Sequence, residues 1–158
     1  MKKLLSIIGA ISLVGTSTLG VISCKVDNVS DCERNDIGNW KQMCPKDQPF
    51  KKVDNKYYVT IWRTTKEDKW KISLFNFINK NITNIDSYNK YILQYSIKQG
   101  YNSGLMLVEQ KDDGRDALIK RWEDDSKQQD FFKSLYKWDT DKSIPSLPKI
   151  DDNGNIIV

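Results

Sequence analysis

The sequence predicts a mainly β protein with one small domain of antiparallel strands, arranged as a meander or in a sandwich-like fold. Three observations support this fold class. Short apolar runs recur along residues 53–140, turn-forming clusters separate them, and aromatic and β-branched residues are common within them. The clearest run alternates apolar and polar positions, with Tyr91, Leu93, Tyr95 and Ile97 on one face. Such alternation is typical of a half-buried strand.

The other elements follow from the same signals. In chain order, the expected strands cover residues 57–63, 70–74, 91–97, 105–110, 117–123 and 132–138. A polar break over residues 64–69 separates the first two strands, and the glycines at 100 and 104 mark a later turn. The segment Asp112-Asp113-Gly114-Arg115 predicts a tight hairpin, because a glycine after aspartate supplies the positive φ that such a turn needs.

A helical interpretation remains open for residues 67–81, 86–99 and 130–138. In the second of these segments the apolar residues also fit a helical stripe, and Asp86 or Ser87 is available as an N-cap. The alternative fold class is therefore α+β with two or three short helices. Short apolar runs and frequent turn signals favour the mainly β interpretation.

Composition divides the chain into four parts. We expect residues 1–23 to form an export leader, and residues 24–52 are polar and irregular, which predicts a flexible tether. That the N-terminus of this tether is lipidated is implied by the resemblance described below. Residues 53–140 form the globular domain. Residues 141–158 contain two prolines and a turn-forming Asp-Asn-Gly, so we expect an extended tail that either packs along the domain or dangles from it.

The leader has the parts that export requires. Lys2 and Lys3 form a positive end, and Leu4 to Val14 supply an apolar segment. A permanent transmembrane anchor is the alternative, since about 20 residues without a charge just cross a ~30 Å hydrocarbon core. The small residues of its second half, the cysteine at its end and the lack of a basic stop-transfer cluster favour a cleaved leader.

The sequence Val21-Ile22-Ser23-Cys24 resembles the lipobox of bacterial lipoproteins, with Val21 at a position where leucine is commonest. The first 13 residues are also similar to leaders of mollicute surface lipoproteins of unknown function. This resemblance covers residues 1–24. It implies that a diacylglyceryl group modifies Cys24, that the leader is removed before it, and that the protein is held on the outer face of the cell membrane.

The two remaining cysteines, Cys32 and Cys44, allow two interpretations. Outside the membrane they can pair, and closing a loop of about 13 residues would stabilise the fold by about 3 kcal/mol. Alternatively both stay free, because neither has a neighbouring histidine to activate it. A metal site is not expected, since two cysteines without histidine fill only half of a zinc shell.

Composition argues against several functions. The chain has no histidine, the commonest proton shuttle near neutral pH, so we expect no enzyme and no cofactor. The acidic pairs Asp112-Asp113, Asp124-Asp125 and Asp151-Asp152 lie in expected turns, where aspartate caps backbone donors. There are 25 basic and 21 acidic residues, and removal of the leader brings the charge near neutrality. A concentrated basic stripe is absent, and nucleic-acid binding is not expected.

We therefore expect a surface lipoprotein that acts as a non-catalytic binding or interaction module, with the membrane and a protein or host surface as its partners. An accessory solute-binding lipoprotein of a transporter is the alternative, and a small enzyme is a weaker one. Tyrosine and tryptophan are the residue types that form contact hot spots, although in a core poor in alanine they also fill the interior. No feature of the sequence indicates an oligomeric state.

Overall fold

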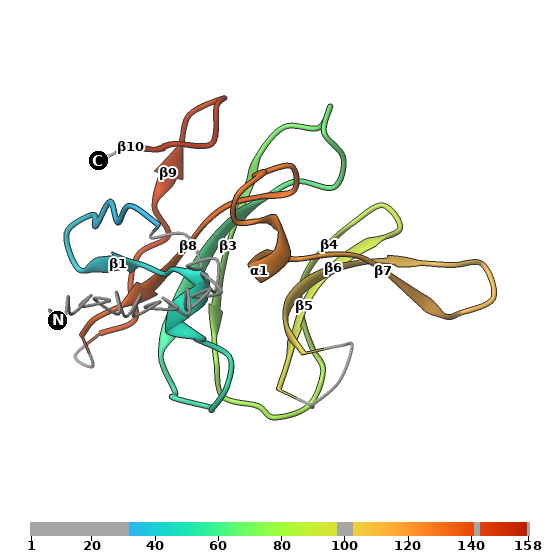
Figure 1. Ribbon diagram of the computed structural model, residues 1–158, viewed down its shortest axis with the longest axis horizontal. Coiled ribbons are helices and arrows are strands. Elements are labelled where there is room, and N and C mark those ends of the chain that lie inside the picture. Colours follow the sequence, from blue (N-terminus) through green and yellow to red (C-terminus); the bar gives the residue numbers. More distant parts are fainter. Residues whose placement is uncertain (1–31, 98–102, 141–142, 158) are drawn as a thin grey trace, which may run out of the picture.

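The computed structural model describes residues 32–97, 103–140 and 143–157, which form two four-stranded antiparallel sheets and a short hairpin (Figure 1). Sheet A has the order β1-β8-β2-β3, with β1 at Trp40–Gln42, β2 at Tyr57–Trp62, β3 at Lys71–Asn76 and β8 at Phe132–Trp138. Sheet B has the order β4-β5-β6-β7, with β4 at Thr83–Tyr88, β5 at Tyr91–Ser96, β6 at Gly104–Gln110 and β7 at Asp116–Arg121. The remaining elements are the 3-10 turn η1 (Pro45–Asp47), the helix α1 (Trp122–Asp125) and the hairpin of β9 (Lys149–Ile150) and β10 (Ile156–Ile157).

The mainly β fold class is confirmed, and the six expected strands correspond to β2, β3, β5, β6, β7 and β8. The helical interpretation is wrong for the described parts of its three segments, which contain β3, β4 with β5, and β8, whereas residues 98 and 99 lie outside the described residues. Gly114 has a φ of +78°, as the expected hairpin requires. Strand β4 was not expected. Its sequence is polar because it is an edge strand with mostly exposed side chains.

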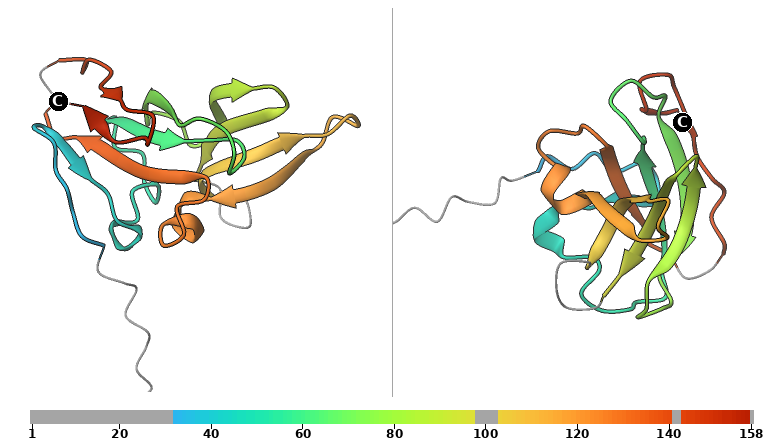
Figure 2. Two further views of the ribbon diagram at one scale, coloured as in Figure 1. Left: turned by 90° about the horizontal axis from the view of Figure 1, so that it is seen from above. Right: turned by 90° about the vertical axis from the view of Figure 1, so that its right-hand side faces the viewer.

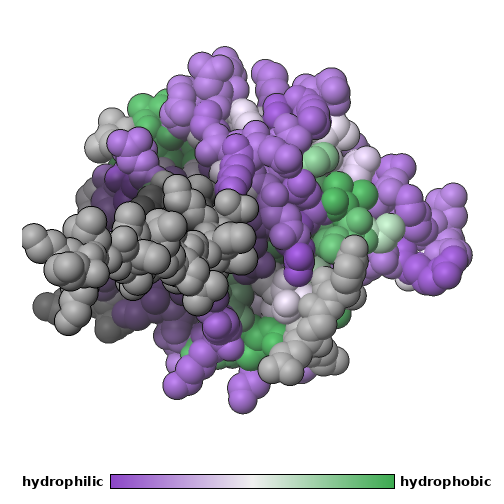
Figure 3. Space-filling model, in the orientation of Figure 1, coloured by the Kyte–Doolittle hydropathy of each residue, from purple (hydrophilic) through white to green (hydrophobic). Residues whose placement is uncertain are grey.

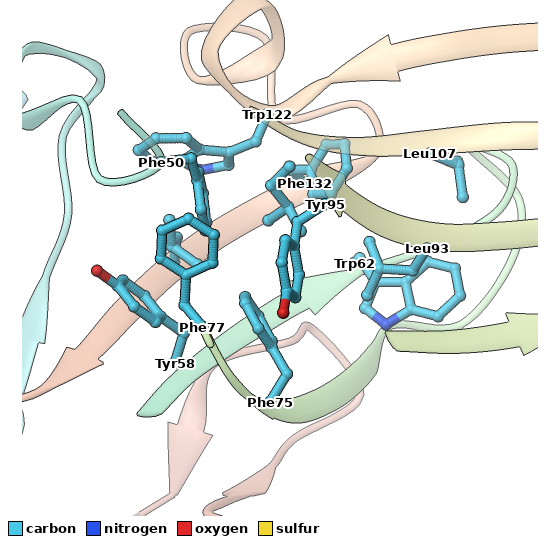
Figure 4. Close-up of a cluster of buried hydrophobic side chains, with 12 residues drawn as sticks. Phe50, Tyr58, Trp62, Phe75, Phe77, Leu93, Tyr95, Leu107, Trp122 and Phe132 are labelled. Atoms are coloured by element: carbon cyan, nitrogen blue, oxygen red, sulfur yellow. The ribbon is translucent and has the colours of Figure 1, made fainter. Parts of the chain in front are cut away.

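The two sheets share a central core that is rich in aromatic rings (Figure 4). Its buried residues come from both sheets and from the segments that connect them: Phe50, Tyr58, Trp62, Phe75, Phe77, Leu93, Tyr95, Leu105, Leu107, Trp122, Phe132 and Leu135. Phe50 lies in the loop before β2 and meets the ring of Phe77 edge to face, with centroids 5.2 Å apart. Tyr58, Trp62, Tyr95 and Trp122 thus serve to fill the interior of the protein.

Strand β2 is buried on both faces, which explains why its sequence reads as a continuous apolar run. Tyr58 and Trp62 point into the central core, whereas Val59 and Ile61 point to the other side of sheet A. There they join a second, outer core with Trp40 and Tyr136.

The C-terminal segment covers this outer core. We expected an extended tail over residues 141–158 that either packs along the domain or dangles from it. In the described residues 143–157 the segment packs on the domain, and its extended conformation is corrected to a hairpin formed by β9 and β10. Ile150 and Ile156 pack against the outer core, and Lys133 of β8 donates a hydrogen bond from Nζ to the carbonyl oxygen of Asn153. The two isoleucines supply the apolar contact surface, and the turn between the two strands is polar.

The expected tether over residues 24–52 also needs correction, because residues 32–52 belong to the folded domain. Strand β1 pairs with β8 through the register Trp40–Trp138 and Gln42–Tyr136. Trp40 and Phe50 are buried in the outer and central cores. These two large apolar side chains anchor the otherwise polar segment in the domain. Pairing with β8 satisfies the backbone donors and acceptors of β1.

The elements divide the molecule into two sides relative to sheet A. In the left view of Figure 2 the C-terminal hairpin lies on one side, while η1 and α1 lie on the opposite side. Cys32, the first described residue, lines the same pocket as Pro45 of η1 and Trp122 of α1. This arrangement places the start of the domain beside the groove described below.

Candidate functional site

The structure joins Cys32 and Cys44 in a disulfide, with a Cα–Cα distance of 5.8 Å that lies within the usual range. Cys44 is fully buried, directly before η1, and Cys32 is the first described residue. The bond therefore ties the entrance of the domain to the end of β1. Cys24, the expected lipidation site, lies outside the described residues.

A polar groove runs beside this disulfide. It consists of two adjoining pockets of about 320 Å³ and 280 Å³. The first lies between residues 32–45 and the segment from α1 to β8, and the second continues toward the C-terminal hairpin. The two pockets share the lining residues Asn35, Gln42, Gln129, Lys133 and Ser134. They form one continuous surface, which we call the polar groove.

A buried carboxylate holds one wall of the polar groove. Asp125 is fully buried at the end of α1, and its Oδ2 accepts hydrogen bonds from the backbone N–H groups of Phe131 and Phe132, both at 2.7 Å. Its carbonyl oxygen accepts from the N–H groups of Gln128 and Gln129. Asp125 therefore closes the loop between α1 and β8 and fixes Gln129 at the groove.

The opposite wall is fixed by hydrogen bonds around β1. The backbone N–H of Asn35 donates to Oε1 of Gln42 at 2.7 Å, and the N–H of Gln42 donates to Oδ1 of Asp36 at 2.9 Å. The Gln42 N–H and the nearby Lys41 ammonium hold the pKa of Asp36 below its usual range. Within β1 itself, the N–H of Gln42 is thus occupied, and the N–H of Trp40 donates to the carbonyl oxygen of Ile37.

Carboxamides and hydroxyls predominate among the polar side chains of the groove. Asn35, Gln42, Gln129 and Asn155 contribute carboxamides, and Ser126 and Ser134 contribute hydroxyls. The Lys133 ammonium lies in the wall but donates to Asn153 and lies 5.8 Å from the centroid of the Trp70 ring. The groove therefore offers paired hydrogen-bond donors and acceptors rather than a concentrated charge.

Another pocket, of about 500 Å³, lies on sheet B along β4 and β5. It is lined by Asn84, Ile85, Asp86, Ser87, Asn89, Ile92 and Gln110. Its walls come mainly from the exposed edge strand β4, which makes it a weaker candidate site than the polar groove.

Hydrophilic residues cover most of the face in Figure 3, and hydrophobic ones gather over sheet B.

The three acidic pairs lie away from the lining of the polar groove. Asp113 pairs with Arg115 in the β6–β7 turn, and Asp124 pairs with Arg121 beside α1. Asp151 accepts hydrogen bonds from Asn155 in the turn of the C-terminal hairpin. Asp113 and Asp151 accept hydrogen bonds from backbone N–H groups of their turns, as the sequence indicates, whereas the Asp124 contact is an ion pair between side chains.

Glu123 is the carboxyl group with the most distinctive surroundings. Burial raises its pKa above the usual value, and its carboxylate lies against the backbone of Gly104 on β6. A β-carbon at Gly104 would approach Oε2 of Glu123 to 3.0 Å. The glycine therefore makes room for this side chain. Glu123 does not line the polar groove, and the neighbouring Asp124 carboxylate, which also raises its pKa, is paired with Arg121.

Sequence reasoning did not find the groove, because its residues come from segments assigned to a tether, a polar loop and a tail. Among the residues that the structure describes, no group of three acidic, cysteine or histidine side chains could hold a metal ion. The same residues contain no helix with the length and apolarity needed to cross a bilayer. Comparison with protein-family models, curated proteins and solved structures finds no match to the chain.

Proposed function

We propose that this protein is a lipid-anchored surface lipoprotein whose β domain acts as a non-catalytic binding module at the outer face of the cell membrane. The observation that supports this proposal most strongly is the lipobox-like Val21-Ile22-Ser23-Cys24 so close to the folded domain. A diacylglyceryl group at Cys24 carries two acyl chains, which is the number that stable anchoring requires.

The position of Cys32 supports a particular orientation of the domain relative to the membrane. Cys32 is the eighth residue after Cys24, and a fully extended chain spans about 3.5 Å per residue, so at most about 28 Å of chain separates the two Cα atoms. The disulfide to Cys44 makes this the entry point of the folded domain. In the proposed arrangement the side with η1, α1 and the first pocket of the groove lies toward the bilayer.

Binding is supported by the make-up of the polar groove. Its carboxamides and hydroxyls can recognise a ligand through directed hydrogen bonds, whereas the acidic side chains of the expected turns are occupied by structural contacts. A chain without histidine, and with no converging carboxylates at the groove, suits capture better than chemistry.

The experiment compares the full chain with Cys24→Ser in bacteria that process lipoproteins. We expect the wild-type protein to enter the detergent phase on phase separation, and its domain to be digested when intact spheroplasts are treated with protease. Cys24→Ser should remain unprocessed and keep its leader, so its mass should stay that of the full chain. Cys44→Ser serves as the control, because it removes another cysteine, one of the disulfide, and leaves the anchor residue in place. Equal processing of the wild type and Cys24→Ser would overturn the proposal.

A further inference from the structure

The polar groove carries an inference about the chemistry of its ligand, and this inference rests on the binding role proposed above. We infer that the groove binds an uncharged saccharide through the carboxamides of Asn35, Gln42, Gln129 and Asn155. The hydroxyl groups of a sugar each donate and accept a hydrogen bond, and a carboxamide offers both functions in one side chain. The hydrogen bonds within the fold determine which of these carboxamide donors and acceptors are available to a ligand.

Two of the four carboxamides are unengaged within the described part of the chain. Neither the side chain of Asn35 nor that of Gln129 forms a hydrogen bond there, although both line both pockets. Gln42 uses Oε1 to accept from the Asn35 N–H, which leaves its NH2 group as a donor. Asn155 donates from Nδ2 to Asp151, which leaves its oxygen as an acceptor.

The charges around the groove favour an uncharged ligand. Lys133 is already engaged by Asn153 and the Trp70 ring, and the remaining charged residues of the lining, Glu33 and Lys127, have opposite signs. Recognition of a carboxylate or phosphate normally uses arginine or several cations directed at one point. The groove has no arginine in its lining.

The hydrogen bonds at β1 argue against an extended peptide as the ligand. Peptides commonly bind by adding a strand to an exposed sheet edge. At this edge the N–H of Gln42 donates to Asp36, and the N–H of Trp40 donates to the carbonyl oxygen of Ile37. A peptide would have to displace both contacts, whereas a sugar can use the side-chain amides that point into the groove.

The saccharide can be soluble or can be the headgroup of a membrane lipid. The two sources present the same hydroxyl groups, and the first pocket includes Cys32, which lies within about 28 Å of chain from the anchor residue Cys24. The experiment therefore has one arm for each source.

The test uses the full lipidated protein, labelled with 15N, in phosphocholine micelles. In the first arm it is titrated with maltotriose and lactose, with sialyllactose and a soluble tetrapeptide as charged and peptide probes. In the second arm the unlabelled lipoprotein is reconstituted in phosphatidylcholine vesicles with or without monoglucosyl diacylglycerol, and protection of groove amides from hydrogen exchange is measured. We expect saturable shifts of the groove carboxamide signals in the first arm or increased protection of groove amides in the second.

Two variants and a control assign the effect to the groove. Gln129→Gly removes a carboxamide without backbone strain, because Gln129 has a φ of +54° that glycine adopts freely. Asn35→Ala removes another. Loss of one net hydrogen bond of about 1 kcal/mol weakens binding about fivefold. Gln128→Ala is the control, because Gln128 neighbours Gln129 but does not line the groove, and it should leave affinity unchanged.

The outcomes separate the inference from the proposed function. A response to neutral saccharides in the first arm assigns a soluble source, and one confined to the glycolipid vesicles assigns a headgroup. Tighter binding of sialyllactose or of the peptide would overturn the inference, as would no response to any saccharide or glycolipid. If the Cys24→Ser comparison still supports lipidation in those cases, only the ligand class is wrong and the anchored location stands.

Discussion

The docking of the C-terminal hairpin can be tested with two glycines of nearly equal backbone conformation. Gly154 lies in the turn between β9 and β10 with a φ of +74°, and Gly114 lies in the β6–β7 turn with a φ of +78°. A β-carbon at Gly154 would lie 2.6 Å from Cγ of Trp70, whereas one at Gly114 would meet nothing within 4 Å. Gly154→Ala and Gly114→Ala therefore share the backbone strain and differ in the contact.

The expected magnitudes follow from these surroundings. The left-handed conformation costs a residue with a β-carbon about 1 kcal/mol, which is the loss expected for Gly114→Ala. At Gly154 the ring of Trp70 has little room to retreat, because the guanidinium of Arg63 lies 4.3 Å from its centroid. The hairpin must leave instead. Its half-buried Ile150 and Ile156 contribute about 1 kcal/mol each, so Gly154→Ala should lose about 2–3 kcal/mol.

Urea denaturation measures the free energy of unfolding, and hydrogen exchange locates the change. Gly154→Ala should lose protection in β9 and β10 and show altered tryptophan fluorescence, while Gly114→Ala keeps both at wild-type values. Equal losses of stability in the two variants, with the hairpin amides equally protected, would refute the contact between Gly154 and Trp70 and with it the docked hairpin.

Three further changes test other parts of the fold. Asp125→Ala should lower the free energy of unfolding by about 2–4 kcal/mol in urea denaturation, because two buried N–H groups lose their acceptor, and Asp125→Asn should lose less than half of that. If the two variants lose equal stability, the carboxylate oxygen is not the acceptor. The raised pKa of Glu123 makes its ionised form unfavourable in the folded state, so its contribution to stability falls as the pH rises above the usual carboxyl pKa. Glu123→Gln should therefore raise the Tm at pH 7 and change it little at pH 4, and a gain that is the same at both pH values would contradict this environment. Reduction of the disulfide between Cys32 and Cys44 should cost about 3 kcal/mol, measured by urea denaturation with and without a phosphine reductant, and a midpoint that does not move would show that the bond does not form.

The strands that could be predicted from the sequence are those with a local pattern of apolar, aromatic and β-branched residues. Strand β5 alternates apolar and polar residues over most of its length, which predicted a strand, but its polar Gln94 and Ser96 are buried as well, so it is not the half-buried strand that alternation indicates. Strand β2 carries a mostly apolar run because it is buried on both faces. The hairpin at Gly114 was predicted because an Asp-Gly turn depends on local backbone conformation alone.

The elements that were not predicted depend on contacts between distant segments. Strand β1 has only three residues and exists because its backbone pairs with β8, almost 100 positions later in the chain. The β9–β10 hairpin has two residues in each strand, and its burial depends on an apolar face of sheet A that the local sequence does not reveal.

The polar groove was missed for the same reason. Asn35, Gln129 and Asn155 lie in three segments that had been assigned to a tether, a polar loop and a tail. A carboxamide in a polar segment is indistinguishable from an ordinary loop residue until the fold brings several together. The signal that could have suggested involvement of residues 32–52 was the presence of Trp40 and Phe50, which are too large to be left exposed without a reason.

The most direct test of the proposed anchoring is mass spectrometry of the N-terminal peptide of the native protein, isolated from membranes. The account predicts a mature chain that begins at Cys24, with a mass increased by a diacylglyceryl group. An intact chain that begins at Met1, or an unmodified Cys24 in protein recovered from the cytosol, would contradict it.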